Sequence, residues 1–408
     1  MTEVASFPAL FPQQADQADV EPDCFNKEAL LRAEALIGTP LRRRPNRTVA
    51  STDTLIGYAR AIGSRIPLYL GPAAGMDTYY GRLVGHPTSL FCFDDTFVAP
   101  SLPGVHALYA GCDFTWHYPI RLGTKITSTA QVTGLTPKKG RFCGDMILQE
   151  SLVEYRDELG RLVAEARPKI LRTPRPPART VGKYAGVEPY EYSPDELDAI
   201  MAGYRAEFVR GSKPLYWEEV SVGDELPPIV RGPLTTEDVG MYVGAIRQTL
   251  FYGDFVDHAR RHPADVFWDP ETGLPDWWDA SLLRDNVAQA FGFSLAHDAG
   301  QQRVAWLENC VSNWAGDFGL VKTLSARVEG PNYRGDATWI SGRVTDKRVV
   351  GEPPAERFEI AFELVATNER GERTASATGT VHTVSHRVDT IPPALELPVH
   401  YEPFRGLP

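Results

Sequence analysis

The sequence PIRLG at residues 119–123 recurs as PNYRG at residues 331–335, at an offset of 331 − 119 = 212 residues. Upstream, residues 51–62 align with residues 235–246, and Tyr58 and Tyr242 give an offset of 242 − 58 = 184. The second copy therefore holds 212 − 184 = 28 additional residues, which lie between positions 246 and 331. An internal repeat of this kind predicts two similar domains in one chain.

The composition is that of a soluble globular protein. The chain has 408 residues, which is comfortable for two domains, with 43% hydrophobic and 23% charged residues. No apolar run approaches the roughly 20 residues of a membrane span, and the first 24 residues lack the basic and apolar segments of a secretory signal. We therefore expect a cytoplasmic protein. A net charge of −11 argues against a nucleic-acid partner.

The sequence contains no evident cofactor or metal motif. Its five cysteines are scattered and form no Cys-x-x-Cys pair, so we expect no zinc site. A Gly-x-Gly-x-x-Gly segment after a strand and a phosphate-binding lysine loop are both missing, so we expect no nicotinamide, flavin or nucleotide cofactor.

Turn and linker residues divide the chain. We expect a tail at residues 1–24 and a first domain at 25–173, followed by a linker with a bridging helix at 174–212. The second domain then spans 213–388 and a second tail spans 389–408. Three prolines near position 175 favour an extended linker, and Ser193 followed by Glu196 predicts a capping box for the bridging helix. Strand-like patterns at 146–171 and 358–384 predict that each domain ends in a hairpin.

One long helix is expected in the second copy, at residues 299–314. Its apolar residues recur every three or four positions, as Val304, Trp306, Leu307, Cys310, Val311 and Trp314. Gly300 lies in the first turn, where backbone N–H groups lack intrahelical acceptors and the helix dipole is positive. This end of the helix is therefore suited to hold a negatively charged oxygen.

Several short motifs carry a family resemblance. Residues 217–226, the segment Ala299-Gly300-Gln301 and residues 314–317 resemble MaoC-like acyl-CoA hydratase domains, and the first copy is similar to the dehydratase-like domain often fused to them. The resemblance covers residues 25–385. It implies an α+β double hot-dog fold, in which two curved antiparallel sheets each wrap a central helix.

The resemblance also implies a reaction. Members of this family add water to, or remove it from, the 2,3 double bond of an enoyl thioester, with coenzyme A as part of the substrate and no separate cofactor. An enolate-like oxyanion develops on the thioester carbonyl and needs a hydrogen-bond donor, which the family provides at the glycine that aligns with Gly300. A carboxylate and an imidazole position water and move its proton.

The family's Gly-Asp-x-Asn-Pro-x-His motif is altered in both copies. In the first copy, Ser64 and Tyr69 stand at the Asp and His positions, so we expect the first domain to be non-catalytic. In the second copy these positions hold Gln248 and Gly253.

Nearby residues provide replacement candidates. Asp254 and His258 would share one face of a helix and form a displaced catalytic pair. Asp257 and His262 are a second candidate pair, and the competing interpretation is that all four are solvated surface charges. The predicted substrate-binding residues are Gln248, His297, Asp298 and Gln301, with a plain helix cap as the alternative role of Asp298.

Other interpretations remain open at this point. The insertion segment at residues 269–278 is rich in turn formers and aromatic residues and predicts a lid or an interface loop. An acyl-CoA thioesterase is the nearest alternative enzyme, and a non-catalytic acyl-CoA-binding subunit is the alternative outside catalysis. Both a monomer and a homodimer are compatible with the sequence.

Overall fold

The structure is a computed structural model of the whole chain. The residues described here are 25–41, 43, 47–76, 78, 80–102, 105–140, 144–174, 186–246, 266–269, 272–273, 275–352 and 356–387.

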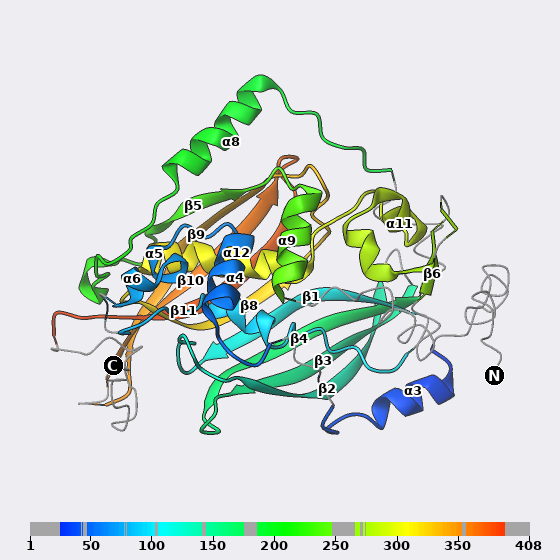
Figure 1. Ribbon diagram of the computed structural model, residues 1–408, viewed down its shortest axis with the longest axis horizontal. Helices are drawn as coiled ribbons and strands as arrows, with labels where there is room; N and C mark the ends of the chain where they lie inside the picture. The colour runs from blue at the N-terminus through cyan, green and yellow to red at the C-terminus, as the bar shows by residue number, and fades with distance from the viewer. Residues whose placement is uncertain are drawn as a thin grey trace, which may run out of the picture.

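Nine strands form one antiparallel sheet, in the order β2-β3-β4-β1-β8-β11-β10-β9-β5 (Figure 1). These strands are β1 (Val105–Trp116), β2 (Thr127–Gly140), β3 (Gly144–Arg156), β4 (Leu162–Pro174), β5 (Glu225–Arg231), β8 (Leu320–Val328), β9 (Thr338–Val350), β10 (Arg357–Asn368) and β11 (Arg373–Thr383). A separate two-stranded hairpin, β6 (Val266–Trp268) with β7 (Pro275–Trp277), lies within the predicted insertion.

The strand order confirms the internal repeat. Strands β1 to β4 correspond to β8 to β11 at an offset close to 212 residues, and the order 2-3-4-1 from one edge matches 9-10-11-8 from the other. The two expected sheets are therefore not separate. They join into one sheet because β1 pairs with β8, from Gly111 opposite Arg327 to Thr115 opposite Thr323. This pairing satisfies the backbone groups of both inner edge strands, which would otherwise be exposed.

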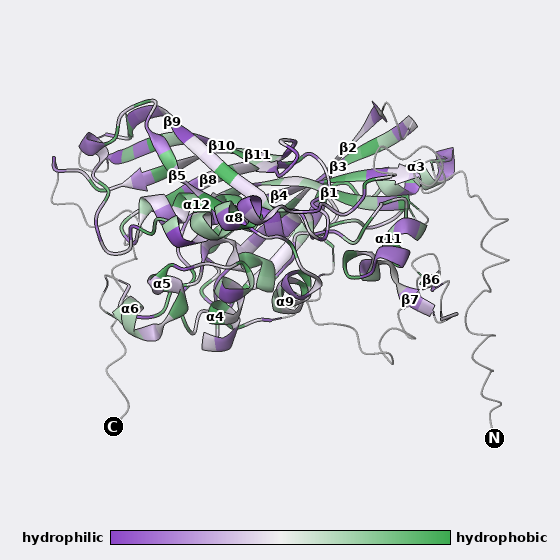
Figure 2. Cartoon of the chain, turned by 90° about the horizontal axis from the view of Figure 1, so that it is seen from above, coloured by the Kyte–Doolittle hydropathy of each residue, from purple (hydrophilic) through white to green (hydrophobic). Residues whose placement is uncertain are grey.

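Helices cover one face of this sheet. In the view of Figure 2, α12 lies between the sheet and a layer formed by α4, α5, α6 and α9. The helices are α3 (Lys27–Glu34), α4 (Thr52–Ala61), α5 (Pro67–Leu70), α6 (Pro72–Met76), α8 (Pro194–Ala206), α9 (Thr236–Ile246), α11 (Asp285–Ala290) and α12 (Gly300–Ala315), with 3-10 helices η1 (Pro87–Cys92), η2 (Trp217–Glu219) and η4 (Trp278–Leu282).

The predicted central helix of the second copy is α12, and every residue from 301 to 315 is buried. The equivalent position in the first copy, 212 residues earlier, holds the six-residue η1. Among the described residues, a long central helix is therefore found in the second half alone. The largest cluster of buried apolar side chains includes residues of both halves, so they share one core.

The bridging helix α8 confirms a local prediction. The Ser193 side chain accepts a hydrogen bond from the Glu196 N–H, and the Glu196 carboxylate accepts one from the Ser193 N–H. The helix packs on β5 of the second half. None of the described helices has both the length and the apolar character needed to cross a membrane.

Candidate functional site

The amino end of α12 begins at Gly300, as predicted. The N-cap residue is Ala299, and no side-chain cap hydrogen bond is formed there. The first-turn N–H groups therefore lack the side-chain acceptor that commonly satisfies them, and the helix dipole adds a partial positive charge. A developing oxyanion is the kind of ligand that such a helix end stabilises.

Gly300 packs directly against β1. A Cβ atom added at this position would lie 3.1 Å from Cβ of Tyr109 and 3.2 Å from its carbonyl oxygen. The start of the second-half helix is thus seated on a strand of the first half, at a separation suited to glycine.

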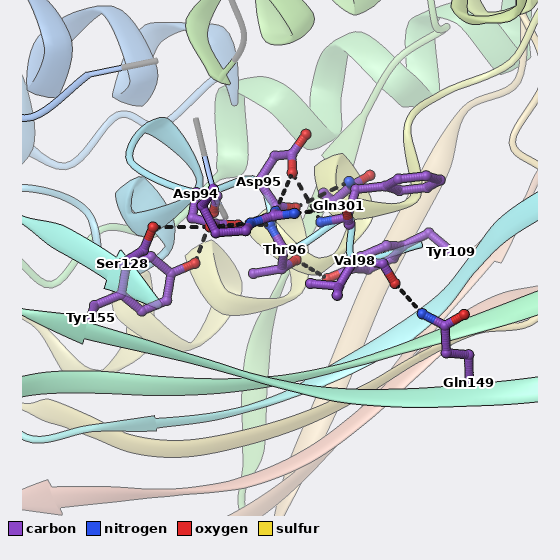
Figure 3. A network of polar contacts seen from close by, with 11 residues as sticks. Asp94, Asp95, Thr96, Val98, Tyr109, Ser128, Gln149, Tyr155 and Gln301 are labelled. Carbon is purple, nitrogen blue, oxygen red and sulfur yellow. Dashed lines mark hydrogen bonds and ion pairs between the residues drawn. The ribbon is translucent and has the colours of Figure 1, made fainter. Parts of the chain in front are cut away.

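A loop of the first half, residues 94–96, lies beside this helix end (Figure 3). The Gln301 side-chain amide donates to the Asp95 carbonyl oxygen at 3.3 Å, and the hydroxyl groups of Thr96 and Tyr109 lie 2.8 Å apart. Thr96 has a φ of +59°, a conformation that β-branched residues rarely adopt. The loop is therefore held in this conformation by its surroundings.

Asp94 anchors the loop. Its carboxylate accepts two hydrogen bonds from the Arg43 guanidinium, at 2.7 and 2.6 Å, and one from the Ser128 hydroxyl at 3.0 Å. The Asp94 side chain is 2% exposed. The Tyr155 hydroxyl donates to the Asp94 carbonyl oxygen at 2.8 Å, so side chain and backbone are both fixed.

His297 lies just before α12. Its Nδ1 is 2.9 Å from the carbonyl oxygen of Asp298, so this nitrogen carries the ring proton and donates. Burial lowers the pKa of His297 to about 4, and the nearby Arg303 charge acts in the same direction. The neutral ring packs 4.3 Å from Phe293, and Nε2 is enclosed without a hydrogen-bond partner among the described residues.

Asp298 has a different environment from the one expected. Its carboxylate is fully buried and lies 2.6 Å from Nε of Arg303, and it also accepts from the Asn332 N–H at 3.3 Å. Burial raises the pKa of Asp298 to about 6 against the opposing effect of Arg303. The alternative role as a helix cap is wrong, because Ala299 is the N-cap residue and Arg303 occupies the carboxylate.

The predicted catalytic pair cannot be compared with this geometry. Asp254 and His258 lie outside the described residues, as do Gln248, Gly253, Asp257 and His262. The roles predicted for Asp254, His258 and Gln248, and the substrate contacts predicted for His297, Asp298 and Gln301, stay predictions. In the insertion, Arg284 bridges Asp269 and Asp276, which ties its two ends together.

A second polar group was missed by sequence reasoning. Tyr69, at the family's histidine position, lies next to the imidazole of His86, with ring centroids 5.2 Å apart. Nε2 of His86 is 2.8 Å from Oε2 of Glu308 on α12, and both side chains are fully buried. Ser64, at the family's aspartate position, is also buried and accepts from the Ile66 N–H at 3.4 Å.

One sequence signal could have indicated this group. Residues 301–315 contain polar side chains on every face of a helix expected to be central, and Glu308 is the acidic one among them. A carboxylate in such a helix needs a buried partner. The identity of that partner, His86 in the other half, could not be derived from local patterns.

The comparisons with known proteins agree with this architecture. Residues 35–166 match the family model described as the FAS1-like dehydratase domain region. A MaoC-like dehydratase of known structure is 17% identical, with 86% of this chain and 99% of that chain covered and a TM-score of 0.58. The chain belongs to the MaoC-like hot-dog fold family. A putative MaoC domain protein dehydratase from Chloroflexus aurantiacus is 15% identical, with 86% and 95% covered and a TM-score of 0.53.

The match to the family model falls on the first half of this hot-dog protein. It supports a hydratase or dehydratase at the general level, and it includes Tyr69 and His86. A comparison of the sequence with curated proteins gave no match. Within the described ranges, no three His, Cys, Asp or Glu side chains are grouped so that they could hold a metal ion.

Proposed function

We propose that this protein is an acyl-CoA hydratase or dehydratase that adds or removes water at the 2,3 double bond of an enoyl thioester. The observation that carries the proposal is the α12 amino end at Gly300, which has no side-chain cap and a positive dipole. In hydration, negative charge develops on the thioester oxygen, and preorganised N–H groups at a helix end stabilise that charge. Coenzyme A enters as part of the substrate.

The double hot-dog arrangement supports this reading of the helix end. Tyr109 of β1 and the Asp95 carbonyl oxygen, both from the first half, lie against Gly300 and Gln301. A substrate bound here would therefore contact both halves. Asp254 and His258 are the proposed acid–base pair, with Gln248, His297 and Gln301 as substrate contacts and Asp298 in support of the loop through Arg303.

A panel of enoyl-CoA and 3-hydroxyacyl-CoA substrates tests the proposal. We expect the ultraviolet absorbance of the conjugated thioester to change without release of free thiol. Immediate thiol release, measured with a thiol-reactive dye, would instead identify a thioesterase. Binding without either reaction across the panel would identify a non-catalytic acyl-CoA-binding subunit.

Single variants test the residues. Asp254→Asn and His258→Ala should each lower kcat by about 10²-fold or more, the usual contribution of a general acid or base. Unchanged turnover in both variants would remove this pair from the mechanism while leaving the reaction itself in place.

A further inference from the structure

His86 and Glu308 form a buried carboxylate–imidazole contact between the two halves of the chain. Nε2 and Oε2 lie 2.8 Å apart, and neither side chain is exposed. The approach does not have the angular geometry of a hydrogen bond, and neither atom has a hydrogen-bond partner elsewhere among the described residues. Two polar groups are therefore held together in the core with unused bonding capacity, which is costly unless the contact has a role.

The surrounding hydrogen bonds define the protonation of this pair. The Thr88 N–H donates to Nδ1 of His86 at 3.3 Å, so Nδ1 presents its lone pair and the neutral ring carries its proton on Nε2, facing Glu308. The Ser312 hydroxyl donates to Oε1 of Glu308 at 2.7 Å. Each carboxylate oxygen thus faces a donor, which favours the charged form of Glu308.

A cavity of about 40 Å³ lies beside the pair. Tyr69 and Ser312 line it, and Ser312 connects it to Glu308. The other walls are largely apolar and include Leu68, Tyr80, Trp116, Ile120, Leu320 and Val321. A water molecule needs roughly 10–15 Å³, so this space suits two or three waters or the reacting carbons of a short acyl group. Tyr118 and Gly319 on its rim are partly exposed.

Tyr69 supplies a neutral hydrogen-bond donor to this cavity. Burial raises the pKa of its phenol well above the usual value, and the negative charge of Glu308 acts in the same direction. Its hydroxyl lies 3.5 Å from Oγ of Ser312. The cavity therefore presents a phenol and a hydroxyl linked to a carboxylate.

We propose that His86 and Glu308 are a second acid–base pair, which adds water to or removes it from a short-chain enoyl thioester bound in this cavity. The inference rests on the proposed function and assigns it a further site in the first half. Glu308 follows Gly300 by eight residues on α12, about 12 Å along the helix axis, so this pair does not serve a thioester held at Gly300.

The reaction balances with one water molecule. Ser312 accepts a proton from the water while it passes its own proton to Glu308, and the water oxygen forms a bond to C3. The C2–C3 π electrons move onto the thioester oxygen, which accepts a hydrogen bond from the Tyr69 hydroxyl. The proton then returns through Ser312 to C2 as the enolate collapses. Glu308 is again a carboxylate, with the Nε2–H of His86 beside it.

Turnover of a four-carbon enoyl-CoA by variants tests this site. Glu308→Gln should lower kcat about 10²-fold or more with a small change in KM, and it should remove the acidic limb of the pH profile. His86→Asn keeps an acceptor for the Thr88 N–H but removes Nε2, and should lower kcat similarly. Tyr69→Phe should reduce kcat by about 10²-fold or more, because it removes the oxyanion donor.

Glu207→Gln is the matched control. Glu207 is an equally buried carboxylate, 2.9 Å from Arg231, and it does not line the cavity. We expect this control to keep kcat even if its urea midpoint falls as much as that of Glu308→Gln. The inference is overturned if Glu308→Gln keeps kcat within twofold of the wild type, or if its loss equals the fraction of unfolded protein.

A binding measurement separates this inference from the proposed function. The ring signal of His86, followed by NMR in protein labelled at histidine Cε1 and assigned with His86→Asn, should shift on addition of a four-carbon 3-hydroxyacyl pantetheine thioester. Ser312→Leu, which fills the cavity, should abolish that shift. A shift without any turnover of the substrate panel would refute the proposed function while supporting this site. No shift at saturating thioester would refute the site whether or not the protein is a hydratase.

Discussion

Gly300 of α12 and Tyr109 of β1 approach so closely that an added Cβ would lie 3.1 Å from the Tyr109 Cβ. A separation of this size is tighter than ordinary van der Waals contact, so the first turn of α12 would have to shift by a few tenths of an ångström. Small displacements of an oxyanion donor reduce catalysis strongly.

We therefore expect Gly300→Ala to lower kcat about tenfold or more while changing the free energy of unfolding by less than about 1 kcal/mol, because alanine also favours the helix. Enzyme kinetics and urea unfolding of the same preparation measure both effects. Gly57→Ala is the control, since Gly57 lies exposed in α4 with no atom within 4 Å of its added Cβ. Full activity of Gly300→Ala would show that this end of α12 does not position the thioester.

Gly111 and Ala326 form an equally close contact at the junction of the two halves. An added Cβ at Gly111 would lie 2.1 Å from the carbonyl oxygen of Ala326, and Gly111 has a φ of +138° at a bulge in β1. Gly111→Ala should therefore disrupt the β1–β8 pairing and destabilise the protein by about 3 kcal/mol or more, as overpacking and backbone strain combine.

Urea unfolding measures this loss. Gly134→Ala is the control, because Gly134 also lies at a bulge, in β2, and its nearest contact is Oε2 of Glu150 at 3.9 Å. If Gly111→Ala unfolds at the same urea concentration as Gly134→Ala, the junction is not a close-packed element of the fold.

Features encoded in consecutive residues were predictable. The repeat at residues 119–123 and 331–335 gave the mirrored strand order, and the apolar spacing after Gly300 gave α12. The capping box at Ser193 was correct because its hydrogen bonds involve only neighbours along the chain. These patterns are local, so one sequence contains them completely.

Features that depend on contacts between the halves were not predictable. The pairing of β1 with β8 joins edge strands whose sequences do not reveal their partner. The contact between His86 and Glu308 has the same origin, and it places a polar pair where the altered motif at Ser64 and Tyr69 predicted an inert domain. Asp298 was misjudged because its competitor for the cap, Arg303, lies one turn later and inside the core.

The buried pair of Arg43 and Asp94 is expected to stabilise the loop beside Gly300. Asp94→Asn would leave the Arg43 guanidinium without a counter-charge, at side-chain exposures of 20% for Arg43 and 2% for Asp94. Breaking a buried pair by changing one partner commonly destabilises by about 3–5 kcal/mol, and partial exposure of Arg43 places the expected value near 3 kcal/mol.

Equilibrium unfolding in urea measures the effect. Arg32→Ala is the comparison, because the Arg32–Glu28 pair is 60% and 81% exposed and its loss should change stability by less than about 0.5 kcal/mol. Equal midpoints for the two variants would mean that Asp94 does not anchor the loop.

His297 predicts a loss of stability at mildly acidic pH. Its folded-state pKa is lowered to about 4 from the ordinary value of 6.5, mainly by burial. Between these values the unfolded chain binds a proton that the folded protein does not. The stabilisation is therefore complete above pH 6.5 and is lost as the pH falls toward 4.

At pH 5 the loss should reach about 2 kcal/mol relative to pH 7.5, from a difference of roughly 1.5 pH units at about 1.4 kcal/mol each. Urea unfolding of the wild type and His297→Asn at both pH values isolates this contribution. The pKa of Asp298, raised to about 6 by burial, acts in the opposite sense in both proteins and largely cancels in the difference. His386→Asn, at a side chain 55% exposed, controls for removal of a histidine. If the wild type and His297→Asn lose the same stability between the two pH values, the His297 ring is not held neutral by the fold.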